Sequence, residues 1–192
     1  MPVRQNLDLD KLEQFRSFLT ENPDKGKLHL EVRALYEGQA GRSTVHVGPY
    51  TLDGDTVQRE TRHYTFPFGA WREVEELIGV QGATDRMEPV EMALAAEAAC
   101  IVNGITFNAA RLGIDTEDIE IHVEADVDPR VLFAIKGPEE HGSCLGEIRY
   151  QVKVKGELSD EDLETIQSLC QHSPVHGMLT EKVRVSGTVA RA

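Results

Sequence analysis

The chain has 192 residues, a length that suits one domain or at most two small ones. Its 33 acidic and 20 basic side chains give a formal net charge of −13, which argues against a nucleic-acid binder and against binding to an anionic membrane surface. Apolar residues make up 40% of the chain, which is enough to form a buried core.

No targeting or membrane segment is evident. The first 15 residues lack the apolar stretch of a signal peptide, and the most apolar segment, 92–102, is interrupted by Glu97. Cys100, Cys144 and Cys170 are too few and too widely spaced for a disulfide framework. We therefore expect a cytoplasmic protein whose cysteines are either packed side chains or reactive thiols.

The first third of the chain predicts one helix followed by an antiparallel meander. Apolar residues at helical spacing place a short helix in 7–20, and 24–27 have the composition of a linker. We accordingly divide the chain into an N-terminal helical extension and linker, 1–26, and a main domain, 27–192. Alternating apolar and polar residues then predict three strands, with a turn at Gly54, over 28–38, 43–52 and 56–66.

A long alanine-rich helix is the clearest element in the middle of the chain. Pro89 favours its start, because the N–H that proline lacks has no partner in a first helical turn. Gly113 favours its end, after about Leu112. A short helix over 71–78 precedes it. A helix this rich in alanine is slim, so it is expected to pack closely at the centre of the fold.

The remaining elements group strands and helices without strict alternation, which favours the α+β class. Ser159, with Asp162 three residues later, predicts the start of a helix that Pro174 ends. Three strands are predicted in this part of the chain, over 118–128, 145–155 and 182–190. A loop over 137–143 is predicted between the first two.

Cys100 lies inside the long helix, where a cysteine is usually a packing group. Glu97 precedes it by three residues and Asn103 follows it by three, so the three side chains lie near one face of the helix. If Glu97 is buried it needs a partner, because an unpaired buried carboxylate is costly. Otherwise it lies at an exposed edge of the helix.

Cys170 falls on the apolar face of the second predicted helix, where packing is again the default interpretation. His172 and His176 follow it closely, a pattern that raises the hypothesis of a zinc site. A structural zinc needs four ligands, and the remaining candidates, His141 and Cys144, form only a loose pattern. The metal hypothesis is therefore weak, and we expect neither a metal nor another cofactor.

Two segments together resemble the OsmC/Ohr family, named for osmotically inducible protein C and organic hydroperoxide resistance. Residues 89–100 resemble its first signature, in which a proline, glutamates and an alanine-rich helix lead to a reactive cysteine. Residues 169–179 resemble the second, a cysteine followed by Pro-Val at a helix break. The resemblance covers roughly 28–190 and is that of a divergent member.

The resemblance implies an intertwined α+β homodimer with two sites at the interface. Active members of the family reduce organic hydroperoxides in the oxidative stress response. A peroxidatic thiolate, activated by an arginine that a glutamate holds, becomes a sulfenic acid. A second cysteine then condenses with it to a disulfide, which a dithiol or a lipoyl protein reopens.

Carried over by position, Cys100 matches the peroxidatic cysteine. Arg62 resembles the activating arginine, with Arg42 as a rival. Val90 stands where the family has its supporting glutamate. Glu91 matches the next position of the pattern, and Glu97 is the alternative carboxylate.

Ser173 stands in place of the family's second cysteine, and a serine cannot form a disulfide. Cys170, about one helical turn earlier, is the candidate replacement, while Ser173 and Asn103 are candidate substrate contacts. Three hypotheses stay open at this point: a thiol peroxidase, a non-catalytic dimer that binds a small apolar or acyl ligand, and a metal-dependent enzyme.

Overall fold

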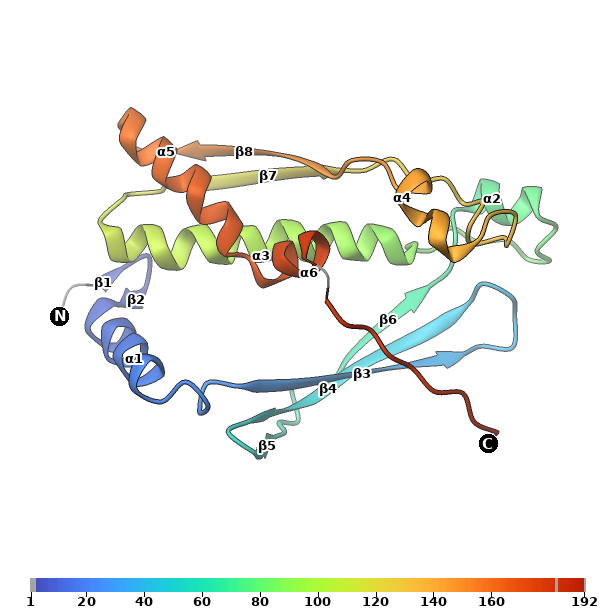
Figure 1. The fold of residues 1–192 in the computed structure, drawn as a ribbon, viewed down its shortest axis with the longest axis horizontal. Coiled ribbons are helices and arrows are strands. Elements are labelled where there is room, and N and C mark those ends of the chain that lie inside the picture. The colour runs from blue at the N-terminus through green and yellow to red at the C-terminus, as the bar shows by residue number, and fades with distance from the viewer. Residues whose placement is uncertain (1–2, 182, 192) are drawn as a thin grey trace. The chain divides into compact units, whose positions relative to one another are not determined.

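The computed structural model describes residues 3–181 and 183–191 (Figure 1). The chain forms two compact units, one that ends at Ala93 and one that begins at Leu94. The boundary falls inside the long helix. The predicted separation of 1–26 from 27–192 rests on composition and stays a prediction.

The first unit begins with a small hairpin and a helix. Strands β1 (Val3–Arg4) and β2 (Leu7–Asp8) pair antiparallel, and α1 (Leu9–Glu21) follows directly. The Asp8 carboxylate accepts a hydrogen bond from the backbone N–H of Lys11 at 3.0 Å, which satisfies one of the free N–H groups at the helix start. The predicted helix over 7–20 is confirmed from Leu9 onward, whereas Leu7 and Asp8 belong to β2.

The predicted antiparallel meander is also present, as the sheet of β3 (Leu28–Tyr36), β4 (Ser43–Leu52), β5 (Asp55–Val57) and β6 (Tyr64–Phe68) (Figure 1). It differs from the prediction in that the strand expected over 56–66 is split into β5 and β6. Both pieces pair with β4, at its opposite ends. Pro49 lies between the two paired stretches of β4, and its missing N–H leaves the ladder without a donor at that point.

Helix α2 (Arg72–Leu77) and the loop after it lead into α3 (Pro89–Leu112), whose bounds agree with the prediction. The start of α3 is capped by two carboxylates. Glu91 accepts a hydrogen bond from the N–H of Glu88 at 2.8 Å, and Glu88 accepts one from the N–H of Val90 at 2.6 Å. Gly113, with φ 86°, ends the helix in the left-handed conformation that glycine adopts without strain.

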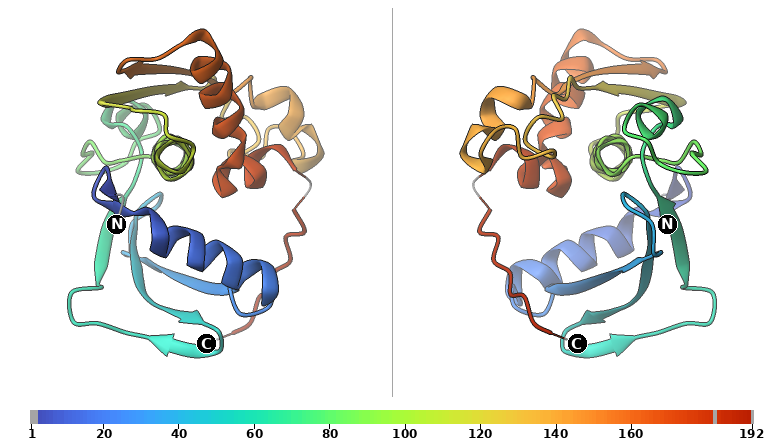
Figure 2. Two further views of the ribbon diagram at one scale, coloured as in Figure 1. Left: turned by 90° about the vertical axis from the view of Figure 1, so that its left-hand side faces the viewer. Right: turned by 90° about the vertical axis from the view of Figure 1, so that its right-hand side faces the viewer.

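The second unit packs an antiparallel strand pair and a helix against the rest of α3. Strands β7 (Asp118–Glu124) and β8 (Arg149–Lys155) form the pair, and α5 (Asp160–Leu169) crosses near α3 (Figures 1 and 2). Ser159 and Asp162 form the predicted capping box of α5. The buried core cluster consists of Ile101, Ile105, Ala109, Ile114, Ile166, Leu169 and Cys170.

Several boundaries in this unit differ from the prediction. Both strands are shorter than expected, because beyond Glu124 only the isolated bridge between Val127 and Leu145 continues the pairing. The predicted loop over 137–143 contains two helical turns, η1 (Pro138–Glu140) and α4 (His141–Cys144).

The C-terminal part of the chain departs further from the prediction. Pro174 does end α5, after the short turn η2 (Cys170–His172), but it also begins a second helix, α6 (Pro174–Thr180). The strand predicted over 182–190 is wrong for residues 183–190, and Lys182 lies outside the described residues. Val183, Val185 and Val189 in this segment are exposed. Alternating sequence makes a strand only where another strand supplies hydrogen-bond partners.

Candidate functional site

The turn between α5 and α6 lies very close to the backbone of α3, and a glycine permits this approach. A Cβ at Gly104 would lie 3.3 Å from the carbonyl oxygen of Leu169 and 3.7 Å from the backbone nitrogen of Ser173. A Cβ here would require the turn to shift by a few tenths of an ångström, and a larger side chain would require more. Gly104 therefore sets the distance between α3 and the segment that carries the second family signature.

Glu97 lies on α3, seven residues before Gly104. It is buried, with 1% of its surface exposed. Its Oε1 lies 3.0 Å from Nδ1 of His176, and its Oε2 accepts a hydrogen bond from the Ser173 hydroxyl at 3.4 Å. The sequence left open whether Glu97 is exposed or buried with a partner. The second alternative is correct, and the partners come from the start of α6.

Ser173 has a second role in the same site. Its hydroxyl accepts a hydrogen bond from the backbone N–H of His176 at 3.0 Å and so caps α6, whose first residue is Pro174. The cap fixes the first turn of α6, and with it the direction in which His176 leaves the helix. Figures 1 and 2 both show α6 beside α3.

Tyr150 and Cys170 line the same region. The ring of Tyr150 meets that of His176 edge to face, with 6.2 Å between centroids. Burial raises the pKa of the Cys170 thiol, and its hydrogen bond with Tyr150 offsets this only in part. Burial also raises the pKa of Tyr150, with the charges of Cys170 and Glu97 acting in the same direction. Cys170 is fully buried, so the predicted packing role accounts for it.

Cys100 is a free thiol that is only partly buried, one turn of α3 from Glu97. Asn103, one turn further, is exposed. The side chains that fill the core from α3 are those at four-residue spacing, Ile101, Ile105 and Ala109. Cys100 thus lies at the rim of the buried face and not within it, which is where a thiol can meet a small molecule.

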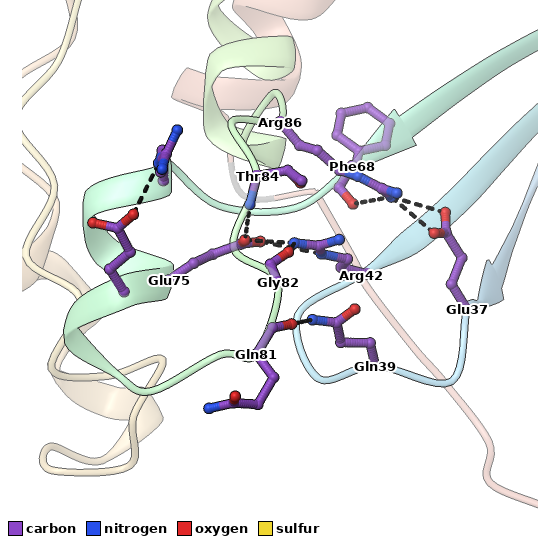
Figure 3. A network of polar contacts seen from close by, with 11 residues as sticks. Glu37, Gln39, Arg42, Phe68, Glu75, Gln81, Gly82, Thr84 and Arg86 are labelled. Atoms are coloured by element: carbon purple, nitrogen blue, oxygen red, sulfur yellow. Dashed lines mark hydrogen bonds and ion pairs between the residues drawn. The ribbon is translucent and has the colours of Figure 1, made fainter.

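Arg42, one of the two candidate arginines, belongs to a buried network in the first unit (Figure 3). Its guanidinium contacts Glu75 at 2.6 and 3.3 Å and donates to the carbonyl oxygen of Gly82 at 3.0 Å. The backbone N–H of Thr84 donates to Glu75 at 2.8 Å. The hydrogen bond from Arg42, followed by that from Thr84, holds the pKa of Glu75 below its usual value.

Arg62, the other candidate, is held by the sheet. Its Nε donates to the carbonyl oxygen of Gly48 at 3.0 Å, and its guanidinium stacks on Tyr50 and Tyr64, 4.8 and 5.7 Å from the ring centroids. Glu91 caps α3, as described above. These residues belong to the first unit, and their predicted roles toward Cys100 stay predictions.

The weak hypothesis of a zinc site at Cys170, His172 and His176 gains no support from the arrangement of these residues. Within 3–181 and 183–191, no group of three or more His, Cys, Asp or Glu side chains is arranged to hold a metal ion. His176 is paired with Glu97, and the thiol of Cys170 donates to the carbonyl oxygen of Ile166 at 3.3 Å. His172 is exposed.

Sequence reasoning did not identify His176 as the partner of Glu97. It also did not identify Tyr150 as the neighbour of His176. One signal was available. Ser173 followed by Pro174 is a helix start, which places residue 176 in the first turn of a new helix beside the cap. The burial of Glu97 demands a partner, but only the packing of α6 on α3 identifies which one.

Helix α3 is long and apolar enough to cross a membrane by length and composition. No segment that meets this criterion was predicted from the sequence. The core helix of a soluble protein meets the same criterion. One face of α3 supplies Ile101, Ile105 and Ala109 to a core shared with α5, and Glu97 in its middle is paired with His176. We therefore interpret α3 as a core helix.

The fold resembles solved structures across most of the chain. An osmotic stress induced and detoxification response protein from Psychrobacter arcticus matches with a TM-score of 0.52 at 13% identity, over 78% of this chain and 88% of that one. An OsmC like protein from Mycoplasma pneumoniae matches with a TM-score of 0.52 at 14% identity, over 80% and 88%. An organic hydroperoxide resistance protein OsmC from Legionella pneumophila matches with a TM-score of 0.47 at 18% identity, over 79% and 89%.

The sequence itself matches a family model. A search of curated proteins finds no match. The model for OsmC-like protein, however, matches residues 82–187, which is more than half of the chain and includes Glu97, Cys100, Ser173 and His176. Together with the α+β fold of the structural neighbours, this match confirms the resemblance seen in the two signatures. The chain belongs to the OsmC family.

Proposed function

We propose that this protein is a thiol-dependent peroxidase that reduces organic hydroperoxides in an oxidative stress response, with Cys100 as its redox-active nucleophile. The observation that carries the proposal is a free, partly exposed thiol at the family's cysteine position, one helical turn from a buried carboxylate. The description of the Psychrobacter arcticus neighbour as a detoxification response protein agrees with it.

The reaction needs few groups. The Cys100 thiolate attacks the terminal oxygen of the hydroperoxide, the O–O bond breaks, and the departing alkoxide takes up a proton to leave as an alcohol. The sulfur is oxidised to a sulfenic acid as the peroxide is reduced. No metal or organic cofactor enters this cycle.

The sulfenic acid must then be reduced, and Ser173 cannot do so. Cys170 is the candidate resolving thiol within the chain, but its complete burial and raised pKa make it a weak nucleophile. We therefore propose that an external dithiol or a lipoyl protein condenses directly with the Cys100 sulfenic acid, releasing water, and that a second thiol of the reductant then breaks the mixed disulfide.

Arg62 remains the proposed activating arginine. What supports it over Arg42 is that Arg42 already neutralises the buried Glu75. Glu97 is the proposed orienting carboxylate of the site, acting through its bonds to His176 and Ser173, because Glu91 is engaged in capping α3. Asn103 and Ser173 are the proposed substrate contacts.

We also propose a cytoplasmic homodimer. What supports the dimer is apolar surface that a single chain leaves uncovered. Leu28, Leu30 and Val32 of β3 are each more than half exposed, as are Val183, Val185 and Val189 in the C-terminal segment. A second copy could cover these side chains and provide the pairing that the predicted last strand lacks. Light scattering coupled to size exclusion tests this, and a monomer at micromolar concentration would contradict it.

The activity is tested by following consumption of cumene hydroperoxide in the presence of a dithiol. We expect turnover by the wild type and none above background by Cys100→Ser, whereas Cys144→Ser should retain it. Equal rates in the wild type and Cys100→Ser would remove the proposal.

A second function, binding of a small apolar or acyl ligand by a non-catalytic dimer, is favoured by the serine at position 173 and the burial of Cys170. In that case Cys100 should react with iodoacetamide at pH 7 no faster than the thiol of glutathione. A clearly faster reaction would argue against this alternative.

A further inference from the structure

We propose that His176 is the proton-transfer residue of Cys100, held in position by Glu97 and Ser173. The inference rests on the proposed function of Cys100 as a nucleophile and adds the group that removes its proton and later delivers it. The histidine comes from α6 and the thiol from α3, in the same unit of the molecule.

The segment from Leu169 to His176 contacts α3 at two points, one on each side of Cys100 along the helix. On one side, His176 and Ser173 bond to Glu97, three residues before the cysteine. On the other, the carbonyl oxygen of Leu169 would lie 3.3 Å from a Cβ at Gly104, four residues after it. Cys100 therefore lies, along the helix, between two contacts of the segment that carries His176.

Helix geometry places the thiol beside the histidine's anchor. At about 100° per residue, Gly104 is turned by about 20° and Cys100 by about 60° from Glu97, in the same direction. Ile101 is turned the other way, into the core, and is fully buried. Cys100 therefore occupies the outer flank of the ridge that the segment from Leu169 to His176 covers, one helical turn from the carboxylate to which His176 is bonded.

His176 is oriented for this task by its surroundings. Nδ1 is committed to Glu97 at 3.0 Å, which leaves Nε2 as the nitrogen available for chemistry. Among the described residues Nε2 has no hydrogen-bond partner, and the side chain is 25% exposed. Of the titratable groups in this region, Glu97 from α3 bonds to the ring, Tyr150 from β8 packs against it, and Cys170 from η2 lies beside Tyr150.

The arrangement follows the logic of a nucleophile, a base and an orienting carboxylate. Nε2 takes the proton of the Cys100 thiol, giving a thiolate and an imidazolium whose charge the buried Glu97 carboxylate balances. The thiolate attacks the terminal peroxide oxygen, the O–O bond breaks, and the imidazolium returns the proton to the alkoxide. The sum is thiol plus hydroperoxide giving sulfenic acid plus alcohol, with His176 neutral again.

Ser173 has a defined place in this arrangement. A hydroxyl can donate to Glu97 and accept from the N–H of His176 at the same time, as the distances of 3.4 and 3.0 Å show. A thiol is a weaker donor and a weaker acceptor. The serine that removes the family's resolving cysteine thus strengthens the support of the histidine.

The test is the rate of alkylation of Cys100 by iodoacetamide as a function of pH, read by peptide mass spectrometry, which does not require peroxidase activity. His176→Asn is the informative variant, because an asparagine amide can still donate to Glu97 but offers no Nε2. His172→Asn is the matched control, an exposed histidine of the same segment.

We expect His176→Asn to slow alkylation of Cys100 by about tenfold or more near pH 7, because an unassisted cysteine is only a few per cent thiolate there. The two rates should converge at about pH 9.5, above the pKa of an ordinary thiol. Glu97→Gln should shift the profile in the same direction, and His172→Asn should leave it unchanged. Superimposable profiles for the wild type and His176→Asn would overturn the proposal.

Circular dichroism confirms that each variant is folded, and Glu97→Gln carries the test if His176→Asn is not. The outcome also separates the two proposals. A His176-dependent profile without peroxide consumption retains the proton-transfer pair and removes the peroxidase. Peroxide consumption with a pH profile that His176→Asn does not change retains the peroxidase and removes the pair.

Discussion

Glu75 in the first unit and Glu97 in the second are almost equally buried, with 2% and 1% of their surfaces exposed, but their partners differ. Glu75 faces Arg42, and a guanidinium is the side-chain cation best suited to a permanent buried ion pair. Glu97 faces the imidazole of His176 and the neutral hydroxyl of Ser173, and histidine is the residue type that proteins use most for proton transfer.

The difference separates a structural pair from a chemical one. Arg42, which lies in the turn before β4, connects that turn to α2 and to the loop at Gly82 (Figure 3). Nearby, Arg86 pairs with Glu37 at 2.9 Å. A fixed charge suits this task, because the contact must not depend on conditions. A carboxylate beside a histidine can instead respond to proton transfer at the histidine, which suits the role that we propose for His176 beside Cys100.

The largest expected effect comes from replacing Glu75 by glutamine, with the same replacement of Glu97 as the comparison. Glu75→Gln leaves Arg42 buried without a countercharge, and we expect the melting temperature to fall by about 5 °C or more. Glu97→Gln leaves a neutral imidazole that can still be hydrogen bonded, and the fall should be about 2 °C or less. Differential scanning calorimetry at pH 7 measures both. Equal losses would contradict the distinction between the two sites.

The pH dependence of stability sharpens the same comparison. The hydrogen bond from Arg42 holds the folded-state pKa of Glu75 below the ordinary pKa of a glutamate. The pair therefore stabilises the protein above that ordinary pKa, and this stabilisation is lost as the pH falls through the folded-state pKa. The melting temperature of Arg42→Met should therefore lie furthest below that of the wild type at pH 7. The gap between the two melting temperatures should narrow toward about pH 3.

Thermal melts of both proteins across this range test it. Arg72→Met, which removes only the exposed pair with Glu76, is the control and should differ little from the wild type at either end. A gap between Arg42→Met and the wild type that stays constant with pH would show that the ion pair is not the source of the loss.

A smaller effect is expected where the turn before α6 approaches α3. Gly104→Val should cost about 1–3 kcal/mol, because its side chain would displace Leu169 and Ser173. Gly177→Val in α6 is the matched control, since a Cβ there meets nothing within 4 Å. Urea denaturation measures the two. If the variants are equally stable, the close approach at Gly104 does not constrain the site.

The smallest effect is expected at the cap of α5. Ser159→Ala removes the hydroxyl that accepts from the N–H of Asp162 and should cost about 1 kcal/mol. Ser159→Asp should restore most of it, because aspartate caps equally well. An alanine variant as stable as the wild type would show that the interaction of α5 with α3, and not its cap, holds the helix in place.

Much of the fold could be predicted because it depends on short stretches of chain. Pro89 and Gly113 bound α3 by their own backbone requirements, and Ser159 with Asp162 marks α5. The split between β5 and β6 could not be predicted from the pattern of residues 56–66, since it depends on where these residues pair with β4, on either side of Gly48 and Pro49. The predicted last strand failed for the related reason that alternation does not supply a pairing partner.

The site divides in the same way. Cys100, Glu97 and Ser173 were recognised as candidates from sequence, by their spacing on one helix and by the family signatures. The bond between Glu97 and His176 spans 79 positions of the chain, and no local pattern indicates it. Nor did composition show that Arg42 is committed to Glu75, 33 positions away.

By itself, the sequence determined the family, the α+β class, the long helix and the position of the thiol upon it, because helix starts, helix ends and periodicity act within a few residues. Tertiary structure decided which residues satisfy the two buried glutamates. Burial makes a partner compulsory, but the partner is whichever polar group the packing of distant segments brings within hydrogen-bond distance. That selection gave Glu75 a fixed charge and gave Glu97 a histidine.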